Sequence, residues 1–102
     1  MTQQSYTRAI GNFYLQLPNT HRRFNRSDRQ LAADLYQRGI AFNLIRSAML
    51  LATARRLARR PAPPLPPVRS LHYFLPVLDE IQHQPLPPGY VEYLECTVAK
   101  YQ

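Results

Sequence analysis

Apolar residues recur at helical spacing from the beginning of the chain. Between residues 4 and 17 they are separated by four, three, one and three positions, at Tyr6, Ile10, Phe13, Tyr14 and Leu17. Steps of this kind place the side chains on one face of a helix. Pro18 and Asn19 follow, and such a pair ends a helical pattern. We therefore predict a first helix over residues 4–17.

A second helical pattern covers residues 28–38. Ser27 has the residue type of an N-cap, and Gln30 three positions later completes a capping box. Gly39 stands where a left-handed C-terminal cap is expected. The buried stripe of this helix is predicted to contain Leu31 and Leu35, with either Ala32 or Tyr36.

The third pattern begins near Phe42 and continues to about Arg59. Its apolar stripe consists of Leu44, Ile45, Ala48, Leu51 and Ala52. Around residues 48–52 the sequence is apolar on nearly every side of a helix. We expect this helix to lie at the centre of the core.

Two proline-rich connectors divide the rest of the chain. Residues 61–67 contain five prolines, which exclude a helix and favour polyproline II, and residues 85–89 form a second rigid segment. Between them Pro76 predicts a kink, or a helix that starts late near Tyr73, with apolar positions at Leu71, Phe74, Leu75, Leu78 and Ile81. A last short helix is predicted from Tyr90, Tyr93, Leu94, Val98 and Tyr101.

The pattern as a whole predicts an all-α fold. No stretch alternates between apolar and polar residues, and 102 residues is the usual size of one domain. We expect a single-domain bundle over 1–102 with about five helices. The longest apolar run, residues 48–52, is far shorter than the ~20 residues that span a bilayer, and no apolar leader follows Met1. We therefore expect a cytoplasmic protein without a membrane partner.

Charge is divided unevenly along the chain. Residues 1–69 contain twelve arginines and two aspartates, a balance of +10, whereas residues 70–102 contain one lysine and four acids, a balance of −3. The chain thus has a basic helical part (1–60), a proline connector (61–67) and a mildly acidic helical part (68–102). A field of this kind concentrates anions at one face, and nucleic acid is the usual polyanion of the cytoplasm.

The first arginine cluster surrounds the predicted start of the second helix, at Arg22, Arg23, Arg26 and Arg29. Unpaired N–H groups already make a helix start positive, so cations there are unfavourable by ~0.3–1 kcal/mol each. Stability therefore does not explain them, and we predict that they contact phosphate groups. In the alternative interpretation they lie on a solvated loop, and Asp28 pairs with one of them.

The second cluster lies at the predicted end of the third helix, at Arg55, Arg56, Arg59 and Arg60. Cations complement the negative end of a helix, which gives this cluster a structural explanation. Four arginines in six residues exceed that need, and their spacing of four produces two parallel rows of charge. These rows fit a phosphate backbone and an acidic protein surface equally well.

The two helices on either side of Gly39 resemble a helix-turn-helix in outline, and Leu31, Leu35, Ile40, Leu44 and Ile45 would pack them together. In that interpretation the third helix reads DNA bases through Asn43 and Arg46. An ordinary helical hairpin of a bundle has the same pattern.

Residues 40–82 carry a second resemblance. A basic apolar helix and a connector are followed by Ser70-x-x-Tyr73-Phe74-x-x-Val77-Leu78-x-x-Ile81. This arrangement resembles the helical modules of DnaD-type and of phage or plasmid replication-initiation proteins. The resemblance implies a module that binds DNA or other replication proteins, and it supplies no site residues.

Groups that support catalysis are sparse in this chain. His21, His72 and His83 lie in three separate segments, and no glycine-rich phosphate loop exists among three glycines. The single cysteine, Cys96, excludes an internal disulfide and a multi-cysteine zinc site. We expect no enzyme activity, no cofactor and no metal site.

Two functions remain open. The first is a small nucleic-acid-binding accessory protein, of replication or of a mobile element, that contacts phosphates through its arginine clusters and binds DNA rather than RNA. The second is an adaptor or subunit that docks on an acidic partner. Its tyrosine-rich C-terminal helix would contact another protein or a second copy.

Overall fold

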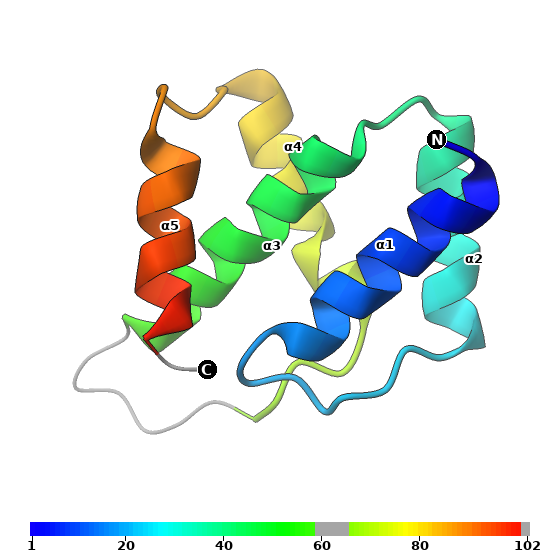
Figure 1. The fold of residues 1–102 in the computed structure, drawn as a ribbon, viewed down its shortest axis with the longest axis horizontal. Helices are drawn as coiled ribbons and strands as arrows, with labels where there is room; N and C mark the ends of the chain where they lie inside the picture. The colour runs from blue at the N-terminus through cyan, green and yellow to red at the C-terminus, as the bar shows by residue number, and fades with distance from the viewer. Residues whose placement is uncertain (59–65, 101–102) are drawn as a thin grey trace.

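The residues that the structure describes form five α-helices, with the central helix α3 between two helix pairs (Figure 1). The structure is a computed structural model and describes residues 1–58 and 66–100. Its helices are α1 (Gln3–Gln16), α2 (Arg26–Gln37), α3 (Phe42–Leu57), α4 (Leu75–His83) and α5 (Tyr90–Ala99), with a 3-10 helix η1 (Leu71–Phe74) before α4. The described residues contain no strand beyond an isolated bridge between Thr20 and Val68. The predicted all-α bundle is confirmed.

The core is built around α3. This helix packs against α1, α4, α5 and η1, and its residues from Ala48 to Ala54 are buried without interruption. Ile45, Ala48 and Met49 have no exposed surface. The prediction of a central third helix is confirmed, because a helix that is apolar on all sides must be surrounded.

Helices α1 and α2 form a hairpin in which the start of α1 lies beside the end of α2. The Tyr36 hydroxyl donates to the carbonyl of Met1 at 3.0 Å, and its ring lies edge-on to Tyr6. At the other end a Cβ on Gly11 would lie 3.1 Å from the Phe24 ring, so the glycine permits close packing of the loop that follows α1. The hairpin holds the start of α2 at one end of the molecule.

The predicted N-cap of α2 was wrong. Asn25, not Ser27, caps the helix: its side chain accepts from the Asp28 amide at 3.0 Å, and the Asp28 carboxylate accepts from the Asn25 amide at 3.1 Å. Asn25 and Asp28 have the same spacing as Ser27 and Gln30, so local sequence supports both boxes. The buried position of Asp28 selects the earlier one, and α2 therefore starts at Arg26.

Other local signals are confirmed. Gly39 adopts a left-handed φ of 76° after α2. Pro76 lies in the first turn of α4, where its missing N–H has no partner to lose, and η1 occupies the turn before it.

The apolar residues predicted to pack α2 and α3 together, Leu31, Leu35 and Ile45, belong to one buried cluster, and Ile40 and Leu44 pack against it. The two helices follow each other through a short turn, but they share no extended interface: α2 packs against α1 and η1, which also contact α3. Apolar stripes such as Leu31 with Leu35 indicate which face is buried, and they do not specify the neighbour. The pair is therefore held by shared neighbours.

The two proline connectors differ in what the structure describes. Residues 59–65 lie outside the described residues, and with them lies most of the first connector (61–67), which is predicted to form polyproline II. Pro67 is exposed, and Val68 pairs with the loop after α1: its amide donates to Asn19 at 2.8 Å, and its carbonyl accepts from His21 at 3.0 Å. In the second connector Leu86 is half-buried between exposed prolines. Within the described ranges, no helix combines the length and the apolar character needed to cross a membrane.

Candidate nucleic-acid interface

The first arginine cluster lies around the N-terminus of α2, fully on the surface. Arg22 and Arg23 belong to the preceding loop, Arg26 is the first residue of the helix, and Arg29 lies one turn later. All four are exposed, and their side chains form no hydrogen bond or ion pair with any described residue. Their side chains are therefore accessible from solvent.

Asp28 lies beneath these arginines and does not pair with them. Its carboxylate is fully buried and accepts hydrogen bonds from the Ser70 hydroxyl at 3.1 Å and the Leu71 amide at 2.9 Å, in addition to the Asn25 amide. The interpretation in which Asp28 pairs with a neighbouring arginine is therefore wrong. The carboxylate connects the start of α2 to the start of η1, two helix ends that favour a negative charge.

The loop that carries Arg22 and Arg23 is held in an unusual backbone conformation. Asn19 has φ of 65° and Arg22 has φ of 61°. Asparagine tolerates this left-handed region, whereas a residue such as arginine adopts it at a cost of roughly 1 kcal/mol. The bonds between this loop and Val68 hold the conformation, and Tyr14 adds another by donating its hydroxyl to the Val68 carbonyl at 3.3 Å.

Burial raises the pKa of Tyr14 from its ordinary value of 10.0 to about 12, with a smaller contribution from the negative charge of Asp28. Its ring is completely buried and contacts Phe24 and Phe74. At neutral pH the phenol is therefore a neutral donor. Through its hydrogen bond to the Val68 carbonyl, the Tyr14 hydroxyl helps to fix the position of the loop.

The structure adds Arg69 to this region, which the sequence analysis did not single out. Val68, before it, pairs with the loop after α1, and Ser70, after it, bonds to Asp28. Figure 1 shows the segment before η1 running beside that loop at the lower edge of the molecule. Arg69 is exposed, and only the long-range pairing brings it here. We call the five exposed residues Arg22, Arg23, Arg26, Arg29 and Arg69 the α2-start surface.

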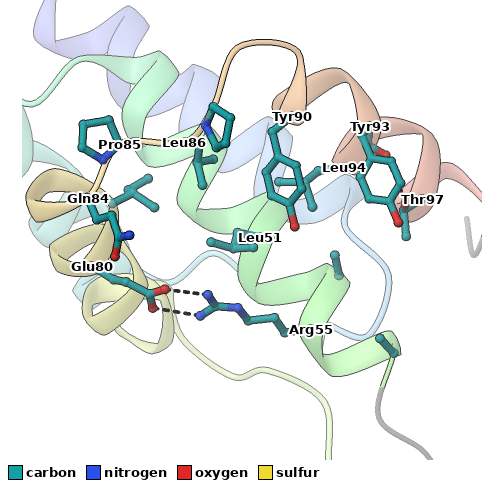
Figure 2. A pocket seen from close by; sticks show the side chains of 14 residues that line it. Leu51, Arg55, Glu80, Gln84, Pro85, Leu86, Tyr90, Tyr93, Leu94 and Thr97 are labelled. Atoms are coloured by element: carbon teal, nitrogen blue, oxygen red, sulfur yellow. Dashed lines mark hydrogen bonds and ion pairs between the residues drawn. The ribbon is translucent and has the colours of Figure 1, made fainter.

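The described arginines of the second cluster are engaged within the protein. Arg55 donates two hydrogen bonds to the Glu80 carboxylate, at 2.8 and 2.5 Å, and this pairing lowers the pKa of Glu80 and raises that of Arg55 (Figure 2). Arg56 donates to the Pro66 carbonyl and to the Tyr73 hydroxyl, and its guanidinium lies over the Tyr73 ring at 5.1 Å. Arg59 and Arg60 lie outside the described residues.

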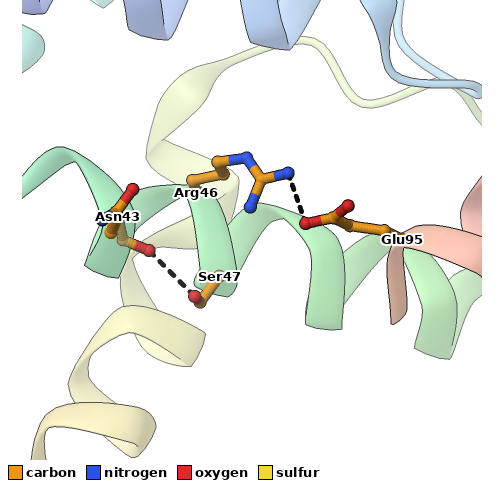
Figure 3. Close-up of polar contacts among 4 residues, drawn as sticks. All are labelled: Asn43, Arg46, Ser47 and Glu95. Carbon is orange, nitrogen blue, oxygen red and sulfur yellow. Dashed lines mark hydrogen bonds and ion pairs between the residues drawn. The ribbon is translucent and has the colours of Figure 1, made fainter. Parts of the chain in front are cut away.

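The predicted base-reading residues of α3 lie apart from the α2-start surface. Arg46 forms an ion pair with Glu95 of α5 at 2.6 Å (Figure 3). Its guanidinium also lies over the Phe13 ring, 5.2 Å from the ring centroid. Asn43 is exposed, and its backbone carbonyl accepts from the Ser47 hydroxyl. Because α3 is surrounded by other helices, its exposed side chains do not form a continuous face.

Two acids of the C-terminal part, Glu80 and Glu95, thus pair with Arg55 and Arg46 of α3. Most of the arginine and lysine side chains left unpaired in the described residues lie at the α2-start surface, whereas Arg8, Arg38 and Lys100 are exposed elsewhere. This redistribution could not be derived from the charge of each segment.

A groove of about 400 Å³ lies between α3, α4 and α5 (Figure 2). Leu51 and Leu94 line its floor, and the Arg55–Glu80 pair lies beside it. Tyr90 and Tyr93 of α5 line one side as a stacked pair, with Tyr93 60% exposed. The described residues include no group of three or more His, Cys, Asp or Glu side chains arranged to hold a metal ion.

Comparisons with protein-family models, with curated proteins and with solved structures gave no match to this chain.

Proposed function

We propose that this protein binds nucleic acid, and DNA in preference to RNA, through the α2-start surface. The observation that carries the proposal is the contrast in how arginines are used. Five exposed arginines surround the positive end of α2 without partners in the described residues, whereas Arg46, Arg55 and Arg56 bond to other parts of the protein. Phosphate groups bind well at a helix start that carries additional guanidinium groups.

The backbone beneath this surface supports the same function. Arg22 is held in a left-handed conformation by the bonds around Val68, and Asp28 anchors the first turn of α2. Strained residues persist where the surrounding structure fixes them, and they cluster at functional sites. A role in replication or in a mobile element, suggested by the resemblance of residues 40–82, is part of the proposal.

Salt dependence of binding tests the proposal. If each of the five arginines neutralises one phosphate, the log–log slope of affinity against salt is about −4.5 on duplex DNA. The measurement is fluorescence anisotropy with duplex DNA, single-stranded DNA and RNA of one sequence. A slope shallower than about −2, or no binding at low salt, contradicts the proposal.

A matched pair of variants locates the interface. Arg26→Gln with Arg29→Gln removes two charges from the α2-start surface, and Arg8→Gln with Lys100→Gln removes two exposed charges from elsewhere. We expect the first variant to lose about two units of slope, because two phosphate contacts disappear. The second retains most of the slope. Equal losses in both variants indicate binding to the net charge alone.

We infer a second function, association through α5, from the stacked tyrosine pair at the groove, of which Tyr93 is exposed and Tyr90 is half-buried. Tyr93 is 60% exposed beside the apolar floor formed by Leu51 and Leu94. Tyrosine is enriched at the centres of protein interfaces. Sedimentation over a concentration series is expected to show a dimer that Tyr93→Arg abolishes. A monomer at all concentrations contradicts self-association.

A further inference from the structure

Helix α2 lies at the edge of the bundle, and its outer side is exposed apart from the half-buried Ala33. Its inner face consists of buried residues, namely Asp28, Leu31, Ala32 and Leu35. The side of α2 opposite this buried face carries a row of residues spaced four, three and four positions apart, namely Arg26, Gln30, Ala33 and Gln37. Among the described residues, the main packing partners of α2 are α1 and η1, which contact its inner side.

We propose that α2 docks in the major groove of duplex DNA and reads bases with the first half of its outer face. The inference rests on the proposed function, which by itself requires only contacts to phosphates. A helix of 12 residues is about 18 Å long and, with side chains, about 10–12 Å wide, so it enters a groove about 12 Å wide. The arginines of the preceding loop and Arg69 then lie at the phosphates that border the groove.

The residue types of the outer face match base edges. Arginine binds guanine through two hydrogen bonds, glutamine binds adenine in the same way, and a methyl group contacts the thymine methyl. Arg26, Gln30 and Ala33 provide these three kinds of contact within the first two turns of α2. Gln30 donates only a long hydrogen bond, 3.3 Å, to Asp34, so its amide can exchange this partner for a base.

The second half of α2 sets the limit of the reading face. Gln37 donates to Gln3 of α1 at 2.6 Å, which commits its amide to the hairpin. Asp34 is exposed and repels phosphates, while its carboxylate accepts hydrogen bonds from a cytosine amino group. Base contacts are therefore concentrated on Arg26, Gln30 and Ala33, with Arg29 at the flank.

The aromatic residues near this surface favour duplex DNA over a single strand. Proteins that bind single strands stack bases on exposed aromatic rings. Within residues 18–37, Phe24 and Tyr36 are half-buried and pack against Tyr14 and Tyr6 of α1. Tyr73 of η1 is 43% exposed, and the Arg56 guanidinium covers one face of its ring. The major groove of duplex RNA is too narrow for side chains to read. The occupant with the matching shape and charge is duplex DNA.

Selection from a random duplex pool, followed by a matched pair of variants, tests base reading. We expect the wild-type protein to enrich a short sequence. Gln30→Ala then lowers affinity for that sequence about tenfold, and leaves affinity for unrelated duplex and the salt slope unchanged. The control is Gln82→Ala, an exposed glutamine of α4 whose removal also leaves the charge unchanged.

A crosslinking measurement tests the docking. In a Cys96→Ala background, the Ala33→Cys thiol is expected to attack an activated disulfide tethered in the major groove of duplex DNA, forming a protein–DNA disulfide and releasing the leaving thiol of the tether. Gln82→Cys, or a minor-groove tether, gives no such product.

The proposal requires both expected results, and the failure of either overturns it. Salt-dependent binding that enriches no sequence, or that is indifferent to Gln30→Ala, overturns base reading by α2 and leaves the proposed function standing. Equal or tighter binding to single-stranded DNA does the same, whereas equal or tighter binding to RNA overturns both base reading by α2 and the preference for DNA in the proposed function. Absence of salt-dependent binding to any of these nucleic acids overturns the proposed function as well.

Discussion

Two regions of this molecule contain clustered arginines, and they use them in opposite ways. At the end of α3, Arg55 and Arg56 bond to Glu80, to Tyr73 and to the backbone of Pro66, so the arginines hold α4, η1 and the connector in place. At the α2-start surface the hydrogen bonds beneath are made by Asp28 and Tyr14, and the arginines point outward. Residue type and number are similar, and the difference lies in which groups make the structural bonds.

This contrast teaches that the density of arginine alone does not identify an interface. A cation that already bonds inside the protein must break those bonds before it binds a phosphate. A cation without a partner binds at no such cost. The two regions therefore separate stability from binding, and substitutions in each should have opposite consequences.

Asp28→Ala is expected to have the largest effect, a loss of about 3 kcal/mol of unfolding free energy. The substitution removes a buried acceptor and leaves the Leu71 amide and the Ser70 hydroxyl without their partner. Urea unfolding measures the loss. Asp34→Ala on the exposed side of the same helix is the control, with a change of about 0.5 kcal/mol or less.

The Asp28→Ala variant also separates the effect of a fixed α2 start on DNA binding from the effect of net charge. Asp28→Ala raises the formal net charge from +7 to +8, so attraction to the overall charge predicts tighter DNA binding. We expect weaker binding instead, because the start of α2 is no longer fixed. Tighter binding by Asp28→Ala than by the wild type contradicts the contrast between the two regions.

Tyr14 predicts a pH dependence of stability on the order of 2 kcal/mol. Its folded pKa of about 12 lies above the ordinary 10.0, so the neutral phenol is favoured by folding. The stabilisation is fully present below about pH 10 and disappears as the pH rises through about 12. We expect the unfolding free energy, measured by urea unfolding at each pH in this range, to fall more steeply with pH for the wild type than for Tyr14→Phe. Parallel curves for the two proteins contradict a buried, neutral Tyr14.

Arg56→Ala and Arg29→Ala compare the two regions one arginine at a time. Arg56→Ala is expected to lower the unfolding free energy by about 1.5 kcal/mol, because bonds to the connector and to Tyr73 are lost. It leaves the salt slope of DNA binding nearly unchanged. Arg29→Ala changes stability by less than about 0.5 kcal/mol and reduces the slope by about one unit. Equal changes in unfolding free energy and in salt slope for the two variants contradict the distinction between the two regions.

Local signals in the sequence predicted most of the fold. The stripe that includes Ile10 and Tyr14, the apolar surroundings of Ala48 and the cap at Gly39 all depend on neighbours within a few positions. Such short-range patterns determine helix identity and the buried face. They do not determine what that face packs against.

The candidate site could be predicted only in part, because its selection depends on long-range contacts. The cap at Asn25 is favoured over Ser27 because Asp28 bonds to a segment more than 40 residues away. The same segment brings Arg69 to the surface. The acids that pair with Arg46 and Arg55 also come from distant helices, so sequence proximity could not separate engaged arginines from unpaired ones.

Arg22 provides the smallest and most specific test of the comparison. Four described residues have positive φ. Three of them are of types that tolerate it, namely Asn19, Gly39 and Gly89, whereas the fourth, Arg22, is of a type that rarely adopts it. The unfolding free energy of Arg22→Gly should therefore be about 1 kcal/mol higher than that of Arg22→Ala, because the alanine Cβ retains the strain of the left-handed conformation. Both variants lose the same charge, so both should lose the same increment of salt slope. A glycine variant that gains stability without recovering binding means that arginine is held in this conformation for its charge, and not for the fold. If the alanine and glycine variants are equally stable, the loop carries no such strain, and Arg22 loses its special place among the arginines of the α2-start surface.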